Sequence, residues 1–400
     1  MTVIFPSVLL ALAAEAGPGF DDTTIRVGMS TVLSGSAAGL GQEMKRGVDM
    51  YFAVVNEKGG VHGRRLELTA LDDGYEPART APNMRKLIDE HDVFAVVGNV
   101  GTPTAVVSVP IANEKKVPLF GALTGAGLLR RSPPDRYVLN FRASYNQEMK
   151  AMIDGLVDEA GIPPDRIAFF TQNDAYGDAG FSGAAKALRA RGYDEIARNV
   201  HGRYQRNTVN VEDGLERILD ARLQPLAVIM VGTYKACAKF VRLARRERFD
   251  AVFLNLSFVG AENLARELDG VGDGRVVITQ VVPPPSAALP ATVSYRRAAG
   301  ARPSTFNSLE GWLAAKAFVA GLESVGRDLS REKFIDAMEA SQDLDLGLGQ
   351  SHALSADQHQ VSHTVWPTLL RTGRWQEFRW ARFRRVLRQR LARLQRTGGR

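Results

Sequence analysis

Short apolar runs alternate with segments of helical spacing from Thr24 onward. Residues 24–32 read TIRVGMSTV, a compact apolar run that is typical of a buried strand. Residues 41–60 then place Met44 and Val48 on one helical face and end at a Gly-Gly pair, which stops a helix. The same order of strand and helix repeats along the chain. This repetition predicts an α/β protein with parallel sheets that carry helices on both faces.

A break in this series divides the chain. The later strand-like runs include RIAFFTQN, LAVIMVG, AVFLNLS and VVITQVV, and three prolines at residues 281–285 then interrupt regular structure. We expect two doubly wound parallel-sheet lobes joined by three crossovers, with a ligand cleft between them. The expected bounds are 1–20 for a signal peptide, 22–143 plus 277–345 for lobe 1, 144–276 plus 346–380 for lobe 2, and 381–400 for a basic tail.

Three loops after expected strands are rich in glycine and hydroxyl side chains. TVLSGSAAGLG places Ser34 at the start of a helix, GNVGTPTA does so for Thr102, and GALTGAG for Thr124. Free N–H groups and hydroxyls at helix N-termini suit a carboxylate or another anion. Serine and threonine also cap helices without any ligand, which is the simpler interpretation for one loop alone. Three such loops at one sheet edge favour a ligand.

Three tyrosines follow expected strands or crossovers of the second lobe. Tyr145 follows the first crossover, Tyr176 lies in QNDAYGDAG, and Tyr234 follows LAVIMVG directly. Each could be ordinary packing. Together they predict a cleft edge that offers apolar faces and hydroxyls to an organic ligand.

The sequence gives little basis for catalysis. It contains no GxxxxGK[ST], no GxSxG and no HExxH, and GSAAGLG lacks the dinucleotide spacing. The single cysteine, Cys237, is interpreted as a buried structural thiol. His352, His359 and His363 crowd one late segment, which we interpret as a solvated loop rather than a metal site. We therefore expect no enzyme activity, no cofactor and no metal.

Charge is concentrated at the C-terminus. The net charge of the 400 residues is +7, and the last twenty residues hold eight arginines and no acid. Without them the chain is close to neutral, which argues against a nucleic-acid partner. Residues Phe383, Leu387, Leu391 and Leu394 would form an amphipathic basic helix. A solvated extension is the preferred interpretation, and a helix on anionic lipid is the alternative.

The N-terminus has the pattern of a secretion signal. It is apolar from Val3 to Ala14 and continues as Ala14-Glu15-Ala16, a small-x-small cleavage pattern, although the usual early Lys or Arg is missing. We expect a secreted, periplasmic protein.

The ordered motifs resemble a known family. IRVGMSTVLSGSAAGLGQEMKRGVDMYFAVVNEKGG, VGNVGTPTA, VPLFGALTGA, NDAYGDAG, TQVVPPP and FNSLEGWLAAKAF are similar to the type I periplasmic binding proteins of the branched-chain amino acid (Leu/Ile/Val-binding) family. Those proteins are the substrate-binding subunits of ABC importers. The resemblance covers residues 24–380 and implies a clamshell that closes on a small-molecule ligand, a permease partner and no catalysis. We expect a monomer.

The resemblance also implies a ligand site. Thr102 matches the hydroxyl that receives the ligand carboxylate, and Thr124 matches the loop beside it. Leu40 falls where the first loop touches the ligand. The candidate ligand-binding residues are Ser34, Leu40, Asn99, Gly101, Thr102, Ala122, Leu123, Thr124, Tyr145, Tyr176, Tyr234 and Ser257.

Ser257 departs from the family pattern. The amino-acid binders carry an acid at this position to pair with the ligand ammonium. A buried ammonium without a carboxylate is costly, so an amine-free aromatic or aliphatic acid is as plausible a ligand as leucine. A ligand-sensing module with the same clamshell is the alternative function. No output domain is evident in the sequence, which favours transport.

Overall fold

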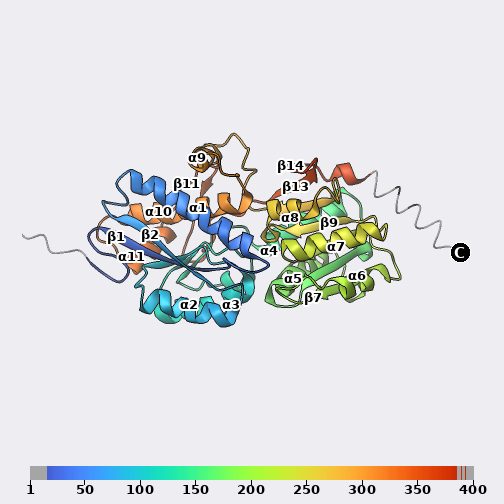
Figure 1. Cartoon of the computed structure of the whole chain (residues 1–400), viewed down its shortest axis with the longest axis horizontal. Helices are drawn as coiled ribbons and strands as arrows, with labels where there is room; N and C mark the ends of the chain where they lie inside the picture. Colours follow the sequence, from blue (N-terminus) through green and yellow to red (C-terminus); the bar gives the residue numbers. More distant parts are fainter. Residues whose placement is uncertain (1–15, 385–388, 390–391, 393–400) are drawn as a thin grey trace, which may run out of the picture.

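Two lobes, each built on its own sheet, make up the computed structural model, which describes residues 16–384, 389 and 392 (Figure 1). The first sheet has five strands in the order β2-β1-β3-β4-β5, and every pairing within it is parallel. Its strands are β1 (Thr24–Thr31), β2 (Arg65–Asp72), β3 (Ala95–Val97), β4 (Leu119–Phe120) and β5 (Val138–Leu139). The expectation of a parallel α/β lobe is confirmed.

Helices cover both faces of the first sheet, with α1 and α10 on one side and α2 and α3 on the other (Figure 1). The helices of this lobe are α1 (Ala38–Glu57), α2 (Pro77–Asp89), α3 (Thr102–Lys115), α9 (Pro290–Ala299), α10 (Phe306–Val325) and α11 (Arg331–Glu339). Because α10 is buried at fifteen of its twenty residues, it is a core helix of the lobe although it comes late in the chain.

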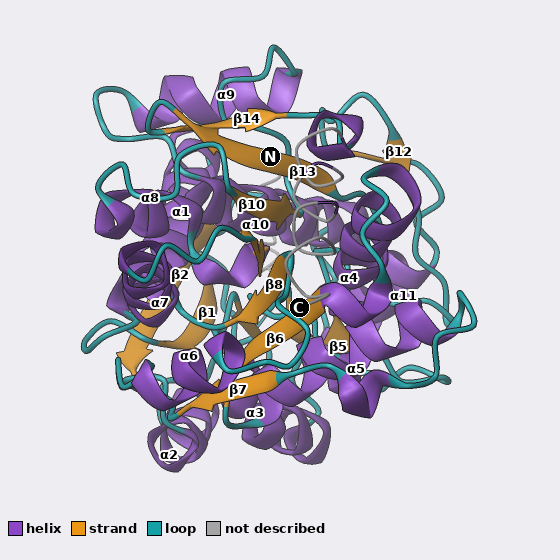
Figure 2. Cartoon of the chain, turned by 90° about the vertical axis from the view of Figure 1, so that its right-hand side faces the viewer, coloured by secondary structure: helices purple, strands orange, loops and turns teal. Residues whose placement is uncertain are grey.

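The second sheet has seven strands in the order β14-β13-β10-β9-β8-β6-β7, and most of this succession is visible in Figure 2. The five parallel strands are β6 (Ile167–Gln172), β7 (His201–Tyr204), β8 (Ala227–Val231), β9 (Val252–Leu256) and β10 (Val276–Gln280). An antiparallel hairpin of β13 (Trp366–Arg371) and β14 (Arg374–Glu377) completes one edge. The apolar-run pattern predicted the parallel strands, whereas it did not predict this hairpin.

The remaining elements surround the second sheet or lie near the crossovers. They are α4 (Tyr145–Ile153), α5 (Ala175–Arg189), α6 (Glu212–Leu219), α7 (Tyr234–Arg246), α8 (Ala261–Leu268), and a small antiparallel pair of β11 (Leu344–Asp345) with β12 (Ser351–His352). Strands β6, β8, β9 and β10 are buried along their whole length, as expected for strands that are covered on both faces.

Two of the expected lobe bounds differ from the structure. Strand β10 pairs with β9 as far as Thr279, so the chain leaves the second lobe after this strand and not at residue 277. Gln360 forms a bridge with Asn140 at the end of β5, so the segment before the third crossover lies against the first lobe. The prolines of residues 281–285 therefore follow β10 and mark the second crossover itself.

One residue inside the expected leader and one inside the expected tail are packed into the fold. Phe20, inside the expected leader, is buried against Phe94 with ring centroids 6.2 Å apart. Near the other end, Phe383 is buried and packs on Trp380 and Phe378. The apolar segment of residues 1–15 and tail residues Leu387, Leu391 and Leu394 lie outside the described residues.

None of the helices in the described part of the chain combines the length and the apolar character that a membrane crossing requires.

The Trp380 contact gives a stability prediction. The ring lies on Gly155, where a Cβ would come within 2.1 Å of it, and the side chain is 4% exposed. Trp380→Ala should lower the free energy of unfolding by about 3–5 kcal/mol, because it removes a large buried side chain. Urea denaturation measures the loss. Arg382→Ala, an exposed change in the same segment, is the matched control. Equal stability of both variants would contradict the packing described here.

Candidate ligand-binding site between the lobes

Loops at the carboxyl ends of the two parallel sheets meet where the lobes face each other. The Gly39 N–H, in the first turn of α1, donates to the Tyr234 hydroxyl at the start of α7 over 3.3 Å. Leu40 lies against Gly260, where a Cβ would come within 2.7 Å of the leucine Cδ2. The lobes are therefore in contact in this conformation, and Leu40 and Tyr234, both expected to touch a ligand, each contact the opposite lobe.

Two threonines of the first lobe form a hydroxyl pair. Thr102 begins α3, and its Oγ1 is 2.7 Å from Oγ1 of Thr124. Both side chains are fully buried. The first N–H groups of a helix have no partner within the helix, and the positive end of the helix dipole lies at the same place. The hydroxyl pair and the start of α3 together suit a carboxylate.

Four aromatic rings lie next to this pair. Tyr145 and Tyr176 of the second lobe have ring centroids 5.5 Å apart, and Tyr176 lies 4.7 Å from Phe258. Tyr75 of the first lobe completes the group at 6.0 Å from Phe258. The Tyr176 hydroxyl is buried and has no hydrogen-bond partner among the described residues, whereas Thr102 and Thr124 lie within bonding reach of the buried Tyr145 hydroxyl. Buried phenol hydroxyls normally have a partner, so the Tyr176 hydroxyl is available to a ligand.

Burial also fixes the protonation of these phenols. It raises the pKa of Tyr176 well above its usual value, and it raises that of Tyr145 although Arg142, Thr124 and Thr102 oppose the shift. Both groups therefore remain protonated donors over the physiological range.

A fully buried arginine connects the first crossover to both lobes. Arg142 lies in the segment before α4, and its guanidinium is 5.8 Å from the Tyr145 ring centroid. Its Nη2 donates to the Ser257 hydroxyl and lies 3.1 Å from Glu148, while Nη1 lies 3.5 Å from Glu310 of α10. Burial opposes the charge of Arg142, but Glu310 and Glu148 outweigh that effect and raise its pKa. Ser257, expected to face the ligand, is therefore a neighbour of a cation.

Glu148 is the carboxylate that holds this arrangement together. Its Oε2 accepts from the Ser257 N–H over 2.8 Å and from the Thr279 hydroxyl over 2.9 Å. Its Oε1 accepts from Arg142 over 3.1 Å and from the Ser257 hydroxyl over 3.0 Å. Burial raises the pKa of Glu148, and Arg142 together with these hydrogen bonds opposes the shift. The carboxylate has four protein donors, which is about its full capacity.

Two further ionisable groups adjoin Arg142. Burial raises the pKa of Glu310 to about 7 against the opposing effect of Arg142. Burial and the Arg142 charge lower the pKa of Arg130 to about 9, and Arg130 donates to the Arg142 carbonyl over 2.9 Å. The interface therefore contains two cations, one fully bonded acid and one acid that is easily neutralised.

Polar contacts at the rim also join the lobes. Arg206 of the second lobe lies 2.7 Å from Glu76 of the first and 3.2 Å from Asp174. The Asn207 side-chain amide donates to the Gly74 carbonyl over 3.1 Å and to Glu76 over 2.6 Å. The Arg206 and Glu76 side chains are 20% and 38% exposed. These contacts are weaker than the buried network because water screens them.

In the contacts described, the side chains of two expected site residues bond only to other residues of the first lobe. Helix α1 begins at Ala38 and not at Ser34, and the exposed Ser34 hydroxyl donates to Asp72 over 2.5 Å. Asn99 accepts from the Ser30 N–H over 2.8 Å, and its amide also contacts a methionine sulfur. The expectation that Ser34 starts the helix is wrong, because the loop turns further before α1 begins. The same expectation is wrong for Thr124, because the loop after it leads only to a single helical turn at Gly127–Leu129.

Three other expected site residues shape the loops around the threonine pair and offer no polar side chain to a ligand. Gly101 has φ of +111°, and a Cβ there would come within 2.3 Å of the Tyr75 ring. Glycine is therefore required for the close approach of this tyrosine. The Leu123 N–H donates to the Asn99 carbonyl over 2.7 Å, and Ala122 is buried in the same loop. These residues position Thr102 and Thr124.

Sequence reasoning missed Tyr75, Arg142, Glu148, Phe258 and Arg206. A charged residue inside the apolar run VLNFRASY was the signal for Arg142, and Glu148 lies on the helix that follows. An isolated charge in a buried segment requires a partner, so this pair could have been predicted. Tyr75 and Arg206 lie in loops whose spacing carries no such signal.

The late histidines are packed rather than solvated. His352 and His359 are each 5% exposed, and His359 lies 3.0 Å from Glu339. The exposed His363 bonds to Gln147. The expected solvated loop is therefore wrong for the first two. Within residues 16–384, 389 and 392, no group of three or more His, Cys, Asp or Glu side chains is arranged to hold a metal ion.

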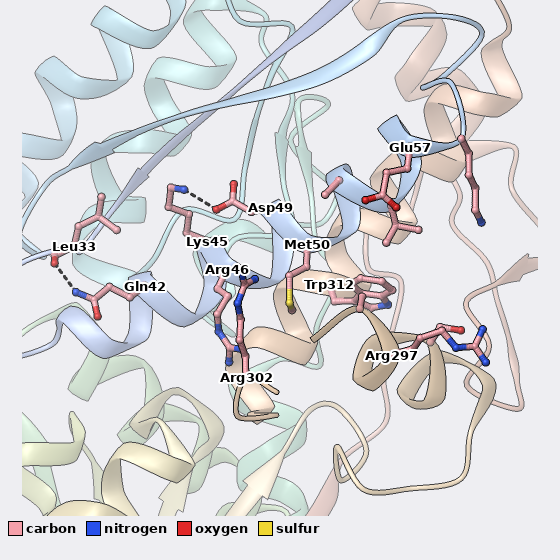
Figure 3. Close-up of a pocket in the computed structure, with 15 residues that line it drawn as sticks. Leu33, Gln42, Lys45, Arg46, Asp49, Met50, Glu57, Arg297, Arg302 and Trp312 are labelled. Atoms are coloured by element: carbon pink, nitrogen blue, oxygen red, sulfur yellow. Dashed lines mark hydrogen bonds and ion pairs between the residues drawn. The ribbon is translucent and has the colours of Figure 1, made fainter. Parts of the chain in front are cut away.

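A surface groove of about 940 Å³ lies on the first lobe, along α1 and facing α9 and α10 (Figure 3). None of the twelve expected site residues lines it. Figure 3 shows Lys45 directed to Asp49, an ion pair of 2.6 Å, and Met50 near Trp312. Since the Thr102–Thr124 hydroxyl pair and the buried Tyr176 hydroxyl lie elsewhere, the interface between the lobes remains the better candidate for the ligand-binding site.

Comparisons with known proteins bear on the fold of the chain. A family model for periplasmic binding proteins matches residues 24–374. The crystal structure of a possible leucine/isoleucine/valine-binding protein from Rhodopirellula baltica SH 1 is 46% identical, with a TM-score of 0.86 over 90% of this chain and 97% of that one. A fatty acid ABC transporter substrate-binding protein from Thermomonospora curvata is 19% identical, with a TM-score of 0.79 over 92% and 96% of the two chains, and shares the fold.

A curated relative is similar over a shorter range. The Leu/Ile/Val-binding protein homolog 2 of Brucella abortus (strain 2308) is 26% identical over 188 residues. The match spans about half the length of that relative (49%) and 47% of this chain.

The rim contacts give a prediction about lobe closure. Arg206→Ala should raise the ratio of open to closed protein about fivefold, because an exposed ion pair contributes about 1 kcal/mol at most. Energy transfer between dyes on α2 and α6 measures this ratio. Arg203→Ala is the matched control, since Arg203 pairs with Asp178 within the second lobe. Identical distance distributions for the two variants would contradict a closing role for Arg206.

A second contact between the lobes predicts a pH dependence. Glu262 of α8 accepts from the Phe306 N–H at the start of α10 over 3.1 Å, and burial raises its pKa from 4.5 to about 7. Glu43 adds to the shift and Arg46 opposes it. The folded protein therefore binds this proton more tightly than the unfolded chain does, and the folded state loses stability as pH rises between these two values.

Glu262→Gln keeps the acceptor and removes this titration. The melting temperature of the variant should rise relative to that of the unchanged protein from about pH 5 to about pH 8. A constant difference across this range would show that Glu262 does not titrate in it.

Proposed function

Since the chain belongs to the periplasmic binding protein family, we propose that it is the solute-binding subunit of an ABC importer and holds a small carboxylate-bearing ligand between its lobes. The ligand would be a branched-chain or other amino acid, or an amine-free organic acid. The family acts outside the cytoplasm, and we place this protein in the periplasm as a monomer that delivers its ligand to a membrane permease.

The Thr102–Thr124 hydroxyl pair is the observation that carries this proposal. The pair lies at the N-terminus of α3, a helix of fourteen residues, within reach of the Tyr145 hydroxyl and near the buried Tyr176 hydroxyl, which has no partner among the described residues. A ligand carboxylate there would accept from the threonine hydroxyls and from free N–H groups of the helix. The relatives named above as Leu/Ile/Val-binding and as fatty-acid-binding support a ligand with an acid group.

We also propose that the protein binds its ligand without reaction, and the state of three side chains supports this. Glu148 and Arg142 are bonded to each other and to Ser257. Burial raises the pKa of Cys237, so this thiol remains protonated and is a poor nucleophile. The side chains at the proposed site therefore bind and orient a ligand, and the movement of the lobes carries the function.

The hydroxyl pair can be tested directly. Thr102→Val keeps the volume of the side chain and removes one donor to the carboxylate, so affinity should fall about 10- to 100-fold. Isothermal titration with leucine, valine, 4-methylpentanoate and 3-phenylpropanoate measures the change. Ser108→Ala is the control, because its buried hydroxyl lies on the same helix and bonds only to the Thr104 carbonyl in the contacts described. Equal affinities for both variants would overturn the proposed carboxylate site.

A further inference from the structure

The acidic side chains around the aromatic rings already accept hydrogen bonds from other groups of the protein. Glu148 has four donors, two of them from Ser257. Asp174 accepts from the Tyr176 N–H over 3.0 Å and from the Gln172 amide over 2.7 Å. Asp174 also lies 3.2 Å from Arg206.

Two acids from the first lobe are equally unsuited to a new ammonium partner. Asp73 is fully buried and accepts from the Ser30 and Thr80 hydroxyls and from the Tyr75 N–H, at 2.8, 3.0 and 2.9 Å. Glu310 lies next to the Nη1 of Arg142, and its pKa is raised towards neutrality. An ammonium would therefore have to displace donors that the protein itself supplies.

A cation lies beside Ser257, the position at which the family resemblance implies an acid in amino-acid binders. The Arg142 guanidinium contacts the Ser257 hydroxyl and lies over the Tyr145 ring. Its Nε and Nη1 are buried and make no hydrogen bond in the described structure. These N–H groups can donate to an acceptor and cannot accept from an ammonium.

On the basis of the proposed function, we infer that the ligand is a carboxylic acid with an apolar body and no ammonium group. Its carboxylate is held by Thr102 and Thr124, and the rings of Tyr145, Tyr176 and Phe258 cover its apolar part. Arg142 and the fully bonded Glu148 exclude an amine at Ser257. A buried ammonium left without an acid is unfavourable enough to weaken binding about 100-fold or more.

Matched ligand pairs test this inference on the full-length protein. Each pair differs only in the amine: 4-methylpentanoate with leucine, and 3-phenylpropanoate with phenylalanine. Titration calorimetry is expected to give at least about 100-fold tighter binding for the amine-free member of one or both pairs. Tighter or equal binding of the amino acids overturns the inference.

The same titrations separate the inference from the function on which it depends. If an amino acid binds as tightly and Thr102→Val weakens it, the carboxylate site stands and only the exclusion of the amine is wrong. If no acid of any pair binds, the proposed function and the inference both fail.

Variants at Ser257 test whether the protein distinguishes amine-free acids from amino acids at this position. Ser257→Asp supplies a carboxylate beside Arg142 and should reduce the preference for the amine-free acid about tenfold or more. Ser257→Ala adds no acid but removes one of the four donors to Glu148, so it should reduce the preference less than Ser257→Asp does. An unchanged preference in Ser257→Asp would place the discrimination elsewhere and overturn the role given to this position. If Ser257→Asp does not fold, the ligand pairs on the unchanged protein still decide the inference.

Discussion

A buried guanidinium organises the centre of this protein, because its charge requires acidic partners. Arg142 is fully buried in the first crossover, and its charge is balanced by acids from two different elements, Glu148 of α4 and Glu310 of α10. Removing either acid would leave a buried charge without compensation, which is a costly state. Glu148 in turn holds the loop after β9 and the strand β10. One set of charges thus links the first crossover, the second sheet and a core helix of the first lobe.

The interface between the lobes is graded from a dry centre to a wet rim. At the centre, Arg142 and Glu148 have no exposed side-chain surface, so their contacts act at low dielectric and hold fixed positions. At the rim, the ion pair of Arg206 with Glu76 is partly exposed and weak. The aromatic rings and the threonine pair lie between these two zones. Such an arrangement suits a clamshell, because the rim can open while the centre continues to define where a ligand will sit.

Thr102 at the start of α3 was predictable from the local pattern, whereas the full ion network was not, because most of its partners are far apart in the chain. Thr102 follows an apolar run and a glycine turn, so the local pattern indicates both a helix start and a free anion site. Glu148 gains its role from Ser257 and Thr279, which are more than a hundred residues away and reach it only through the pairing order of the second sheet. The hairpin of β13 and β14 escaped prediction because its residues are mixed in character, as edge strands commonly are.

The late position of α10 in the chain has a consequence for the order of synthesis. This helix packs so closely on α1 that a Cβ at Gly47 would come within 2.0 Å of the Ser308 carbonyl oxygen. The first lobe therefore cannot complete its core until a segment beyond residue 300 has left the ribosome. By then all five parallel strands of the second sheet have been made. During translation the lobe that begins first is thus the one whose core closes later, and α1 waits without the helix that packs against it.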